Sequence, residues 1–337
     1  MDEGAIKTLF LPFENGDLSL PQYDARWLFL NAEIPPVSDQ CWQENLDCIQ
    51  GFRPSFLALQ QSGFRVTPLA ESSEHAGALV LLGKHRELNR RNIFTAMERT
   101  LPGAPILVSG AKTSGVQAMR KEMSDLVTIE QSLSKNHAQV FCFKRPEHWV
   151  SPVSGHASTI VSGELTFETA PGMFSHKAVD SGSELLAKHF DKITGKVADL
   201  GAGWGYLSAA LLQKCPAVTA VDLFEADHAS LEAARYNLQK LSPMLTIGFH
   251  WVDLLQEPVQ GPYDAVIMNP PFHLGRSTDA SIGQRMIAIA SKALKPGGRL
   301  MMVANKELPY EDTLQRAFRK FERVDENRQY KVIRAMK

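Results

Sequence analysis

Residues 197–205 read Val-Ala-Asp-Leu-Gly-Ala-Gly-Trp-Gly, and this stretch decides which fold the sequence favours. The apolar residues 197–200 predict a short buried strand, and the apolar pattern of residues 206–214 predicts a helix directly after the glycines. Glycines at alternate positions allow the backbone to turn sharply and to approach a ligand where any Cβ would collide. The stretch is therefore typical of the first turn of a β-α-β unit.

The segments that follow this turn alternate between strands and helices. The expected elements are strand 217–224, helix 228–240, strand 246–252, strand 264–268, a helix that ends in Lys295-Pro296-Gly297-Gly298, and strands 299–303 and 329–334. Such alternation predicts a mainly parallel sheet with helices on both faces. Ligands of these sheets bind at the carboxyl ends of the strands.

The first half of the chain repeats this order at an offset of roughly 190 residues. Its expected elements are strand 78–82, a helix that ends in Leu101-Pro102-Gly103, strand 105–109 and a closing strand at 139–144. Because the order of strand, helix, Pro-Gly turn and strand is shared, we expect a duplication rather than two unrelated β-α-β units.

The two halves differ at the positions that carry chemistry. The second half contains Asn269-Pro270-Pro271-Phe272, whereas the first half has Leu82-Gly83-Lys84-His85 in its place and no matching glycine-rich loop. We therefore expect two tandem α/β domains with doubly wound sheets, a degenerate one at 1–150 and an active one at 164–337. The Pro-, Ser- and Gly-rich residues 146–163 predict a linker or a crossover strand between them.

Composition sets broad limits on the class of protein. The 337 residues predict about two domains, and the formal charge of −1 means that any nucleic acid must bind through local patches. The four cysteines (Cys41, Cys48, Cys142 and Cys215) have no metal-ligand spacing and are too few for a disulfide scaffold. The acidic start and the lack of a long apolar run disfavour secretion and membrane insertion. We expect a cytoplasmic protein without a metal.

Three acidic residues follow successive strands. Asp199 precedes the glycines, and either Asp222 or Glu225 on the next strand can accept two hydrogen bonds from a ribose diol. We prefer Glu225 because it lies at the end of that strand. Asp222 is then expected either to point elsewhere along the strand or to form a structural ion pair. Asp253 ends the third strand and is a candidate acceptor for an adenine amino group, although an isolated Asp there is more often a turn former.

The tetrapeptide Asn269-Pro270-Pro271-Phe272 follows the fourth strand. Two prolines make a stiff turn that donates no N–H, so its carbonyl groups stay available as acceptors. The carbonyls of Asn269 and Pro270 can hold the protons of a planar exocyclic amine, and Phe272 offers a face for stacking a base. A strong general base is not needed, and the neighbouring His273 is expected to be a solvent-facing loop residue. The alternative is a capped turn with a buried Phe.

This series of motifs resembles the class I S-adenosylmethionine-dependent methyltransferases. The stretches Pro171–Ser175, Asp180–Ser183 and Val303–Tyr310, together with the degenerate first half, resemble more closely the ribosomal RNA guanine-N2 methyltransferases of the small-subunit (RsmC-type) group and its large-subunit relative. The resemblance implies a Rossmann-like fold in both halves and S-adenosylmethionine as the cofactor. The cofactor-binding residues it implies are Asp199, Gly201, Ala202, Gly203, Gly205, Glu225, Asp253 and Asn269.

The resemblance also implies that the tetrapeptide serves the target amine and that the first domain assists folding or RNA binding. The expected partner is ribosomal RNA or a partly assembled small ribosomal subunit. The densest basic cluster of the first half supplies candidate phosphate contacts, namely Lys84, Arg86, Arg90 and Arg91. A solvated helix start explains this cluster about equally well, and Arg319, Lys320 and Arg323 are expected on a solvated helix face.

Two other functions stay open. One is a methyltransferase for another planar nitrogen, adenine N6 or glutamine N5, but those groups usually carry Tyr at the fourth tetrapeptide position, and the glutamine-specific enzymes lack a degenerate repeat. The other is a non-catalytic RNA-binding assembly factor, which predicts a decayed site in the second half. The intact acids, glycines and Asn269 favour an active enzyme.

Overall fold

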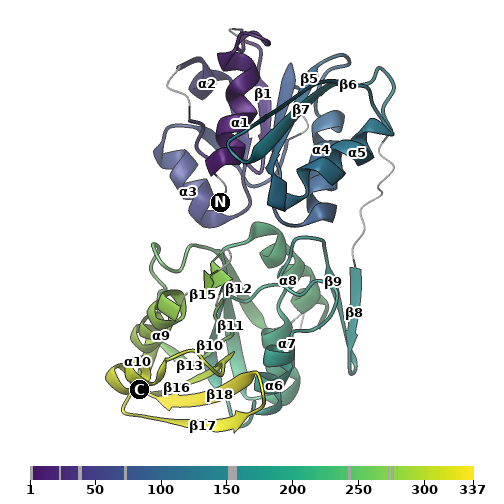
Figure 1. The fold of residues 1–337 in the computed structure, drawn as a ribbon. Helices are drawn as coiled ribbons and strands as arrows, with labels where there is room; N and C mark the ends of the chain where they lie inside the picture. Colours follow the sequence, from purple (N-terminus) through teal and green to yellow (C-terminus); the bar gives the residue numbers. More distant parts are fainter. Residues whose placement is uncertain are drawn as a thin grey trace. The chain divides into compact units, whose positions relative to one another are not determined.

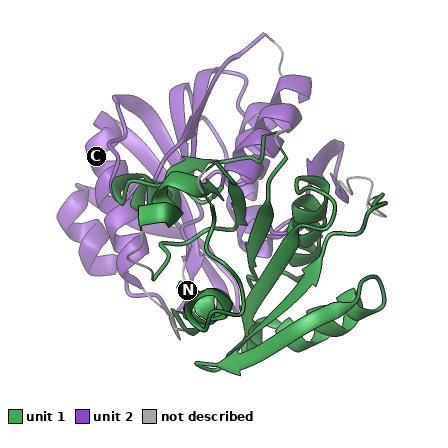
Figure 2. Cartoon of the chain, turned by 90° about the horizontal axis from the view of Figure 1, so that it is seen from above, with its two compact units in different colours: residues 1–156 green, residues 157–337 purple. Residues whose placement is uncertain are grey.

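The computed structural model describes residues 3–22, 24–36, 40–71, 74–150, 158–241, 244–271 and 280–337, and the backbone of 273–274 and 277–278. The chain forms two compact units, Met1–His156 and Ala157–Lys337 (Figures 1 and 2). Each unit is built around its own seven-stranded sheet.

Unit 1 has a sheet of order β3-β2-β1-β4-β5-β7-β6, in which β7 runs antiparallel to both of its neighbours, β5 and β6. Its elements are α1 (Glu3–Glu14), β1 (Trp27–Leu30), α2 (Gln40–Asn45), β2 (Leu46–Ile49), α3 (Arg53–Gln61), β3 (Arg65–Thr67), β4 (Gly77–Leu81), α4 (Arg86–Glu98), β5 (Pro105–Ala111), α5 (Val116–Ser124), β6 (Ile129–Lys135) and β7 (Ala138–Lys144). Leu9, Trp42 and Leu59 from α1–α3 pack on one face. Ile93 and Met119 from α4 and α5 pack on the other.

Unit 2 has a sheet of the same order, β12-β11-β10-β13-β16-β18-β17. Its elements are β8 (Ser158–Ser162), β9 (Leu165–Thr169), α6 (Ser181–Lys188), β10 (Gly195–Leu200), α7 (Tyr206–Lys214), β11 (Val218–Glu225), α8 (His228–Leu241), β12 (Thr246–Trp251), β13 (Tyr263–Met268), β14 (His273–Leu274), β15 (Ser277–Thr278), α9 (Ala280–Ala293), β16 (Leu294–Asn305), α10 (Glu311–Ala317), β17 (Lys320–Glu326) and β18 (Tyr330–Met336). Leu186, Leu211 and Leu238 from α6–α8 pack on one face. Ile287 and Leu314 from α9 and α10 pack on the other.

The two doubly wound sheets expected from the sequence are therefore both present. In unit 2 the strand order reverses between β10 and β13, which are hydrogen-bonded neighbours. The crevice at the carboxyl ends of two such strands is where doubly wound sheets bind ligands. The fold thus brings the loop after β10 and the loop after β13 to the same edge of the sheet.

The register corrects one detail of the sequence alignment. Leu30 pairs with Val80 in unit 1 as Leu200 pairs with Met268 in unit 2. The residue after Val80 is Leu81, so residues 81–84, and not 82–85, occupy the place of the tetrapeptide. The apolar run 78–82 has no polar residue inside it to fix the alignment, which explains the error of one residue.

Three local expectations also differ from the structure. The expected linker or crossover strand contains β8, which forms a hairpin with β9 outside the main sheet. The turn Pro296-Gly297-Gly298 lies within β16 and not at the end of a helix. Lys320 and Arg323 lie on the edge strand β17, because the helix α10 ends at Ala317.

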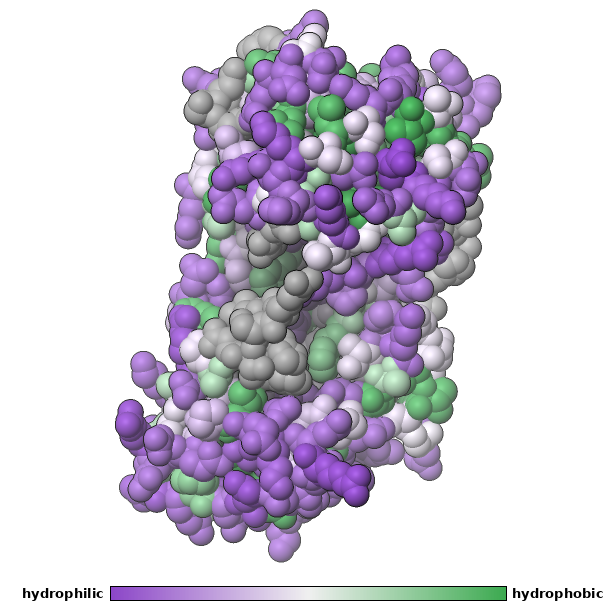
Figure 3. Space-filling model, viewed as in Figure 1, coloured by the Kyte–Doolittle hydropathy of each residue, from purple (hydrophilic) through white to green (hydrophobic). Residues whose placement is uncertain are grey.

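The surface of both units is mostly polar on the face that Figure 3 shows, as expected when the apolar side chains pack between sheets and helices. The apolar residues on this face are scattered between polar ones. In the part of the chain that the structure describes, no helix has both the length and the apolar character needed to span a membrane.

Candidate active site

The glycine loop after β10 has a backbone shape that only glycine adopts easily. Gly201, Gly203 and Gly205 have φ values of 76°, 55° and 90°, all in the left-handed region. The N–H of Gly201 donates to the carbonyl oxygen of Phe224 at 2.8 Å, which fixes the loop to the end of β11. A Cβ added at Gly203 has no atom within 4 Å among the described residues. The loop therefore presents bare backbone to an open hollow.

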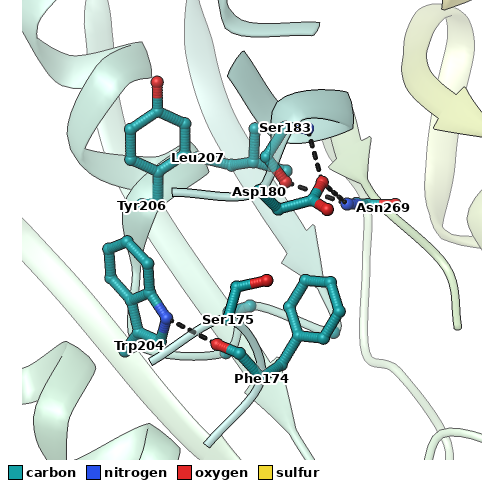
Figure 4. A pocket seen from close by; sticks show the side chains of 11 residues that line it. Phe174, Ser175, Asp180, Ser183, Trp204, Tyr206, Leu207 and Asn269 are labelled. Carbon is teal, nitrogen blue, oxygen red and sulfur yellow. Dashed lines mark hydrogen bonds between the residues drawn. The ribbon is translucent and has the colours of Figure 1, made fainter. Parts of the chain in front are cut away.

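Trp204 lines one wall of this hollow and is otherwise packed into the core. Its side chain is buried, and its ring packs against Phe167 and Tyr206. Its indole N–H donates to the carbonyl oxygen of Phe174 at 2.8 Å (Figure 4). A bulky residue inside the glycine loop thus holds residues 174–175 beside it.

Glu225 ends β11 next to the glycine loop. Its Oε2 accepts a hydrogen bond from the Gly203 N–H and its Oε1 accepts one from the Asp227 N–H, both at 2.8 Å. Burial raises the pKa of the Glu225 carboxyl, and these two N–H groups offset part of that effect. Each carboxylate oxygen can accept more than one hydrogen bond, so the group can still receive a diol.

Asp222, the other acid considered for the ribose, is engaged within the sheet. Its carboxylate forms an ion pair with Lys196 at 2.7 Å and accepts a hydrogen bond from the Tyr263 hydroxyl at 2.8 Å. Burial alone raises the pKa of Asp222, but these contacts lower it below the ordinary value overall. Asp222 thus forms the structural ion pair that was one of its two expected roles.

Asp199 lies beneath the glycine loop and is fully buried. Its Oδ2 accepts a hydrogen bond from the Ser208 hydroxyl at 2.7 Å, and its Oδ1 has no hydrogen-bond partner among the described residues. Burial raises the pKa of Asp199 to about 7, and the nearby charge of Glu225 adds to this effect. The residue supports the loop from inside the fold.

Asp253 has the local role that is common for an acid after a strand. Its Oδ1 accepts a hydrogen bond from the Leu255 N–H at 2.8 Å, and its Oδ2 accepts one from the Gln256 side chain at 2.7 Å. The side chain is buried and closes its own turn. A contact with adenine therefore stays a prediction.

Asn269 follows β13 and is held by two residues of the stretch Asp180–Ser183, to which the sequence analysis assigned no role in the site. Its Nδ2 donates to Asp180 Oδ2 and to Ser183 Oγ, each at 2.9 Å (Figure 4). Asp180 also caps α6 by accepting a hydrogen bond from the Ser183 N–H at 2.8 Å. The Asp-x-x-Ser pattern predicts a helix start, but nothing in it indicates a contact with a residue 89 positions later.

The glycine loop, the start of α6 and Asn269 line a common hollow. Its described lining consists of Phe174, Ser175, Asp180, Ser183, Gly201, Ala202, Gly203, Trp204, Tyr206, Leu207 and Asn269. The structure therefore brings the glycine loop and Asn269 together, whereas Glu225 and Asp253 are not part of this lining. Pro270 is buried and Pro271 is exposed, and Phe272 lies outside the described residues.

The basic cluster of unit 1 lies at the start of α4. Lys84, Arg86 and Arg91 are exposed, and Arg90 is partly exposed. Glu122 on α5 pairs with Arg86 at 2.7 Å and with Arg90 at 3.6 Å, which reduces the local positive charge.

Comparison with known proteins identifies the family. Residues 164–334 match the model of the methyltransferase small domain. The ribosomal RNA small subunit methyltransferase C of Shewanella loihica is 31% identical over 268 residues, which cover 77% of each chain. The protein of that name from Escherichia coli O17:K52:H18 is 33% identical over 238 residues, 69% of this chain and 67% of its own. This chain belongs to the ribosomal RNA small subunit methyltransferase C family.

The family fold extends over both units. The structure titled T. Thermophilus 16S rRNA N2 G1207 methyltransferase (RsmC) in complex with AdoMet and guanosine has a TM-score of 0.79 and 23% identity. It covers 94% of this chain, and the match covers 89% of that protein. The methyltransferase C architecture is thus shared by the degenerate unit as well as by the unit that contains the glycine loop.

Proposed function

We propose that this protein transfers a methyl group from S-adenosylmethionine to the exocyclic N2 amine of a guanine in the RNA of the small ribosomal subunit. The observation that carries the proposal is the common hollow of the glycine loop and Asn269. In this hollow the bare backbone of the glycine loop, which suits a cofactor, lies beside an amide that can accept a hydrogen bond from an amine. Relatives of this chain are named small subunit methyltransferases, which supports the same class of RNA.

The residues at the carboxyl edge of the sheet fit S-adenosylmethionine. The bare backbone of Gly201–Gly203 and the hollow beside it suit the amino-acid end, and the Glu225 carboxylate at the end of β11 suits the ribose diol. Asp253 lies beyond the next strand, where the adenine is expected. When bound, S-adenosylmethionine supplies a methyl carbon on a positively charged sulfur.

The protein's own contribution is to hold and polarise the amine. A conjugated exocyclic amine is a weak nucleophile, and acceptors on its N–H groups favour the positive charge that develops on nitrogen. Asn269 Oδ1 and the Pro270 carbonyl are the acceptors we assign to this role. Alignment of the amine with the methyl carbon supplies the rest of the acceleration. Phe272 is assigned to stacking the base.

Unit 1 is assigned to RNA binding. Asn89 exchanges two hydrogen bonds of 2.8 Å with the backbone of Gly83, which fixes the loop that contains Lys84. This loop follows the strand that corresponds to β13 of unit 2. A fixed loop with exposed cations suits phosphate contacts, which give affinity without reading sequence. Action on ribosomal RNA also implies the cytoplasm as the site of action.

The test uses the full-length protein and small ribosomal subunits from cells that lack it. Methyl transfer from labelled S-adenosylmethionine is measured, and nuclease digestion with mass spectrometry identifies the modified nucleoside. We expect N2-methylguanosine at one position. Methylation of adenine or of a protein glutamine would assign the enzyme to another acceptor. Subunit binding without any transfer would make the protein an assembly factor.

A further inference from the structure

We infer that Asp180 and Ser183 are positioning residues that lock the side-chain amide of Asn269 in one of its two orientations. This inference rests on the proposed function, because it concerns the same acceptor amine. Neither residue is expected to touch the reacting atoms. Their effect is to decide which end of the Asn269 amide faces the substrate.

The hydrogen bonds make the two orientations unequal. Asn269 Nδ2 donates to Asp180 Oδ2 and Ser183 Oγ, each at 2.9 Å. An ionised carboxylate only accepts hydrogen bonds, so a turn of the amide by 180° would place Asn269 Oδ1 against another acceptor. That turn would also leave Asp180 without its donor from Asn269. Figure 4 shows the amide nitrogen facing Asp180 and the oxygen end directed away from it.

The start of α6 gives this lock a rigid base. Asp180 Oδ2 accepts from the Ser183 N–H at 2.8 Å as the helix cap, so the same oxygen receives two donors. Ser183 is buried, and a Cβ on Gly182 would meet the Tyr330 ring at 2.9 Å. Because Asp180, Gly182 and Ser183 have little room to move, the acceptors stay where Asn269 needs them.

The orientation matters because the substrate nitrogen is also a donor. Guanine N2 carries two N–H groups, and Asn269 can hold them only through its oxygen. The reversed amide would present N–H to N–H and repel the amine. A charged partner on Nδ2 also polarises the amide, which makes Oδ1 a better acceptor. The orientation of the Asn269 amide therefore affects the rate of methyl transfer.

The sharpest test exchanges the two partners. Asn269→Asp alone places two carboxylates in contact, and we expect kcat to fall by about 100-fold. Asp180→Asn alone allows both amide orientations, and we expect a fall of about tenfold in kcat. The Kd for S-adenosylhomocysteine is measured in parallel, because Asp180 also lines the hollow. In the double variant, Asn at 180 can donate to Asp at 269 and still cap α6. We expect it to recover at least about tenfold in kcat over Asn269→Asp.

Ser183→Ala removes one acceptor and leaves the backbone cap bond in place. We expect kcat to fall by about three- to tenfold, with KM for the small subunit and the melting temperature near wild type. The matched control is Ser181→Ala, the same change at an exposed position of the same helix turn, and it should match wild type. A purely structural role would lower the melting temperature and leave kcat unchanged.

A second readout does not depend on activity. In protein labelled with ¹⁵N-asparagine, the side-chain N–H signals of Asn269, assigned by their loss in Asn269→Ala, should exchange slowly with solvent. Asp180→Asn and Ser183→Ala should both speed that exchange.

Three results would overturn the inference: unchanged Asn269 exchange in both variants, wild-type kcat in Asp180→Asn, or a double variant no better than Asn269→Asp. If the wild-type protein transfers no methyl group to small subunits, the proposed function fails. The exchange measurement still decides whether the lock exists.

Discussion

The two units of this protein have sheets of the same strand order, but only unit 2 has the residues that we assign to the active site. Their registers superimpose position by position: Leu28 pairs with Asp47 and Ala78 in unit 1, as Ala198 pairs with Asp222 and Val266 in unit 2. Because these pairs fix which residues correspond, each functional side chain of unit 2 has an identifiable counterpart in unit 1.

The amino ends of the two sheets carry the same cluster. Two residues before Leu28 and Ala198 stand Arg26 and Lys196, and each forms an ion pair with the aspartate of the next strand. Three residues before Ala78 and Val266 stand His75 and Tyr263, and each bonds to the same aspartate, at 3.1 Å and 2.8 Å. This end of the sheet has kept its contacts in both units.

The carboxyl ends differ residue by residue. Gln50 stands in the place of Glu225, Glu33 in the place of Gly203, and Leu81 in the place of Asn269. Even so, the Phe52 N–H donates to Gln50 at 2.9 Å as the Asp227 N–H donates to Glu225 at 2.8 Å. Unit 1 therefore shares the hydrogen bonds that build the turn, but it has other residues where unit 2 has the groups that we assign to binding and methyl transfer. On this assignment, the contacts common to both units lie at one end of the sheet and the chemistry lies at the other.

The largest effect is expected where the units differ most. Asn269→Ala removes the acceptor for the amine and should lower kcat by about 100- to 1000-fold, because the group acts in the transition state. The Kd for S-adenosylhomocysteine, measured by calorimetry, should stay within about threefold of wild type. Equal losses of binding and transfer would contradict the role assigned to Asn269.

Converting one unit toward the other tests the comparison directly. Glu225→Gln copies Gln50 into unit 2 and should weaken S-adenosylhomocysteine binding by about 10- to 100-fold, because a charged acceptor for the diol is lost. The reverse change, Gln50→Glu, should not create a second site, since Glu33 occupies the position of Gly203. Calorimetry should give one bound ligand per chain for Gln50→Glu; two would show that unit 1 has kept its cradle.

The basic cluster of unit 1 predicts a smaller effect, confined to RNA. Reversing the charge of Arg86, Arg90 and Arg91 should weaken binding of small-subunit RNA by about tenfold at moderate salt and flatten the salt dependence. Methyl-donor binding should not change. The matched control reverses Arg316, Arg319 and Lys320 in unit 2. Similar losses in both triple variants would assign the effect to net charge and not to the cluster.

The sequence was sufficient for the fold class because periodic apolar runs report burial, but it did not reveal α1–α3, β1–β3 and β6 of unit 1 or β17 of unit 2. The helix at residues 206–214 and the strand ends near Leu200 and Met268 agree with the structure, and so does the repeat. The hairpin of β8 and β9 was missed because β8 lies within the segment rich in Pro, Ser and Gly that was interpreted as a linker or a crossover strand, and the alternating pattern of β9 is only five residues long.

The site was predictable only where the chemistry lies in neighbouring residues. The sequence predicts the roles of the glycine loop, Glu225 and Asn269, because each lies at or directly after the end of a predicted strand. It does not predict the roles of Asp180 and Ser183, because their contact with Asn269 arises from the packing of α6 against the end of β13. The sequence also does not predict that the Trp204 side chain is buried, because its hydrogen-bond partner is a backbone carbonyl of a segment 30 residues earlier.

The cluster at the amino ends of both sheets is expected to have the smallest effect on binding and methyl transfer, and to affect stability with a defined pH dependence. Burial alone raises the pKa of Asp47, but the hydrogen bonds from His75 and Arg26 bring it well below its usual range, and the pKa of Asp222 is also lowered. A carboxyl with a lowered folded-state pKa stabilises the protein above its unfolded pKa, near 4, and loses this contribution as the pH falls through the folded value. Asp47→Asn and Asp222→Asn should therefore each lower the free energy of unfolding by about 1–3 kcal/mol at pH 6.

Calorimetric melting at pH 6 and pH 3 checks this dependence. The gap between wild type and each variant should shrink at pH 3, where the wild-type carboxyls begin to lose their charge advantage. If the difference in stability between wild type and each variant does not change with pH, the two aspartates stabilise their units by packing and neutral hydrogen bonds and not by their charge. Because Asp47 lies in unit 1 and we assign the cofactor site to unit 2, Asp47→Asn should keep the wild-type Kd for S-adenosylhomocysteine at pH 6. A weaker affinity in Asp47→Asn would show that the two units are coupled. The ion-pair cluster of unit 1 would then support cofactor binding in unit 2 as well as the stability of its own sheet.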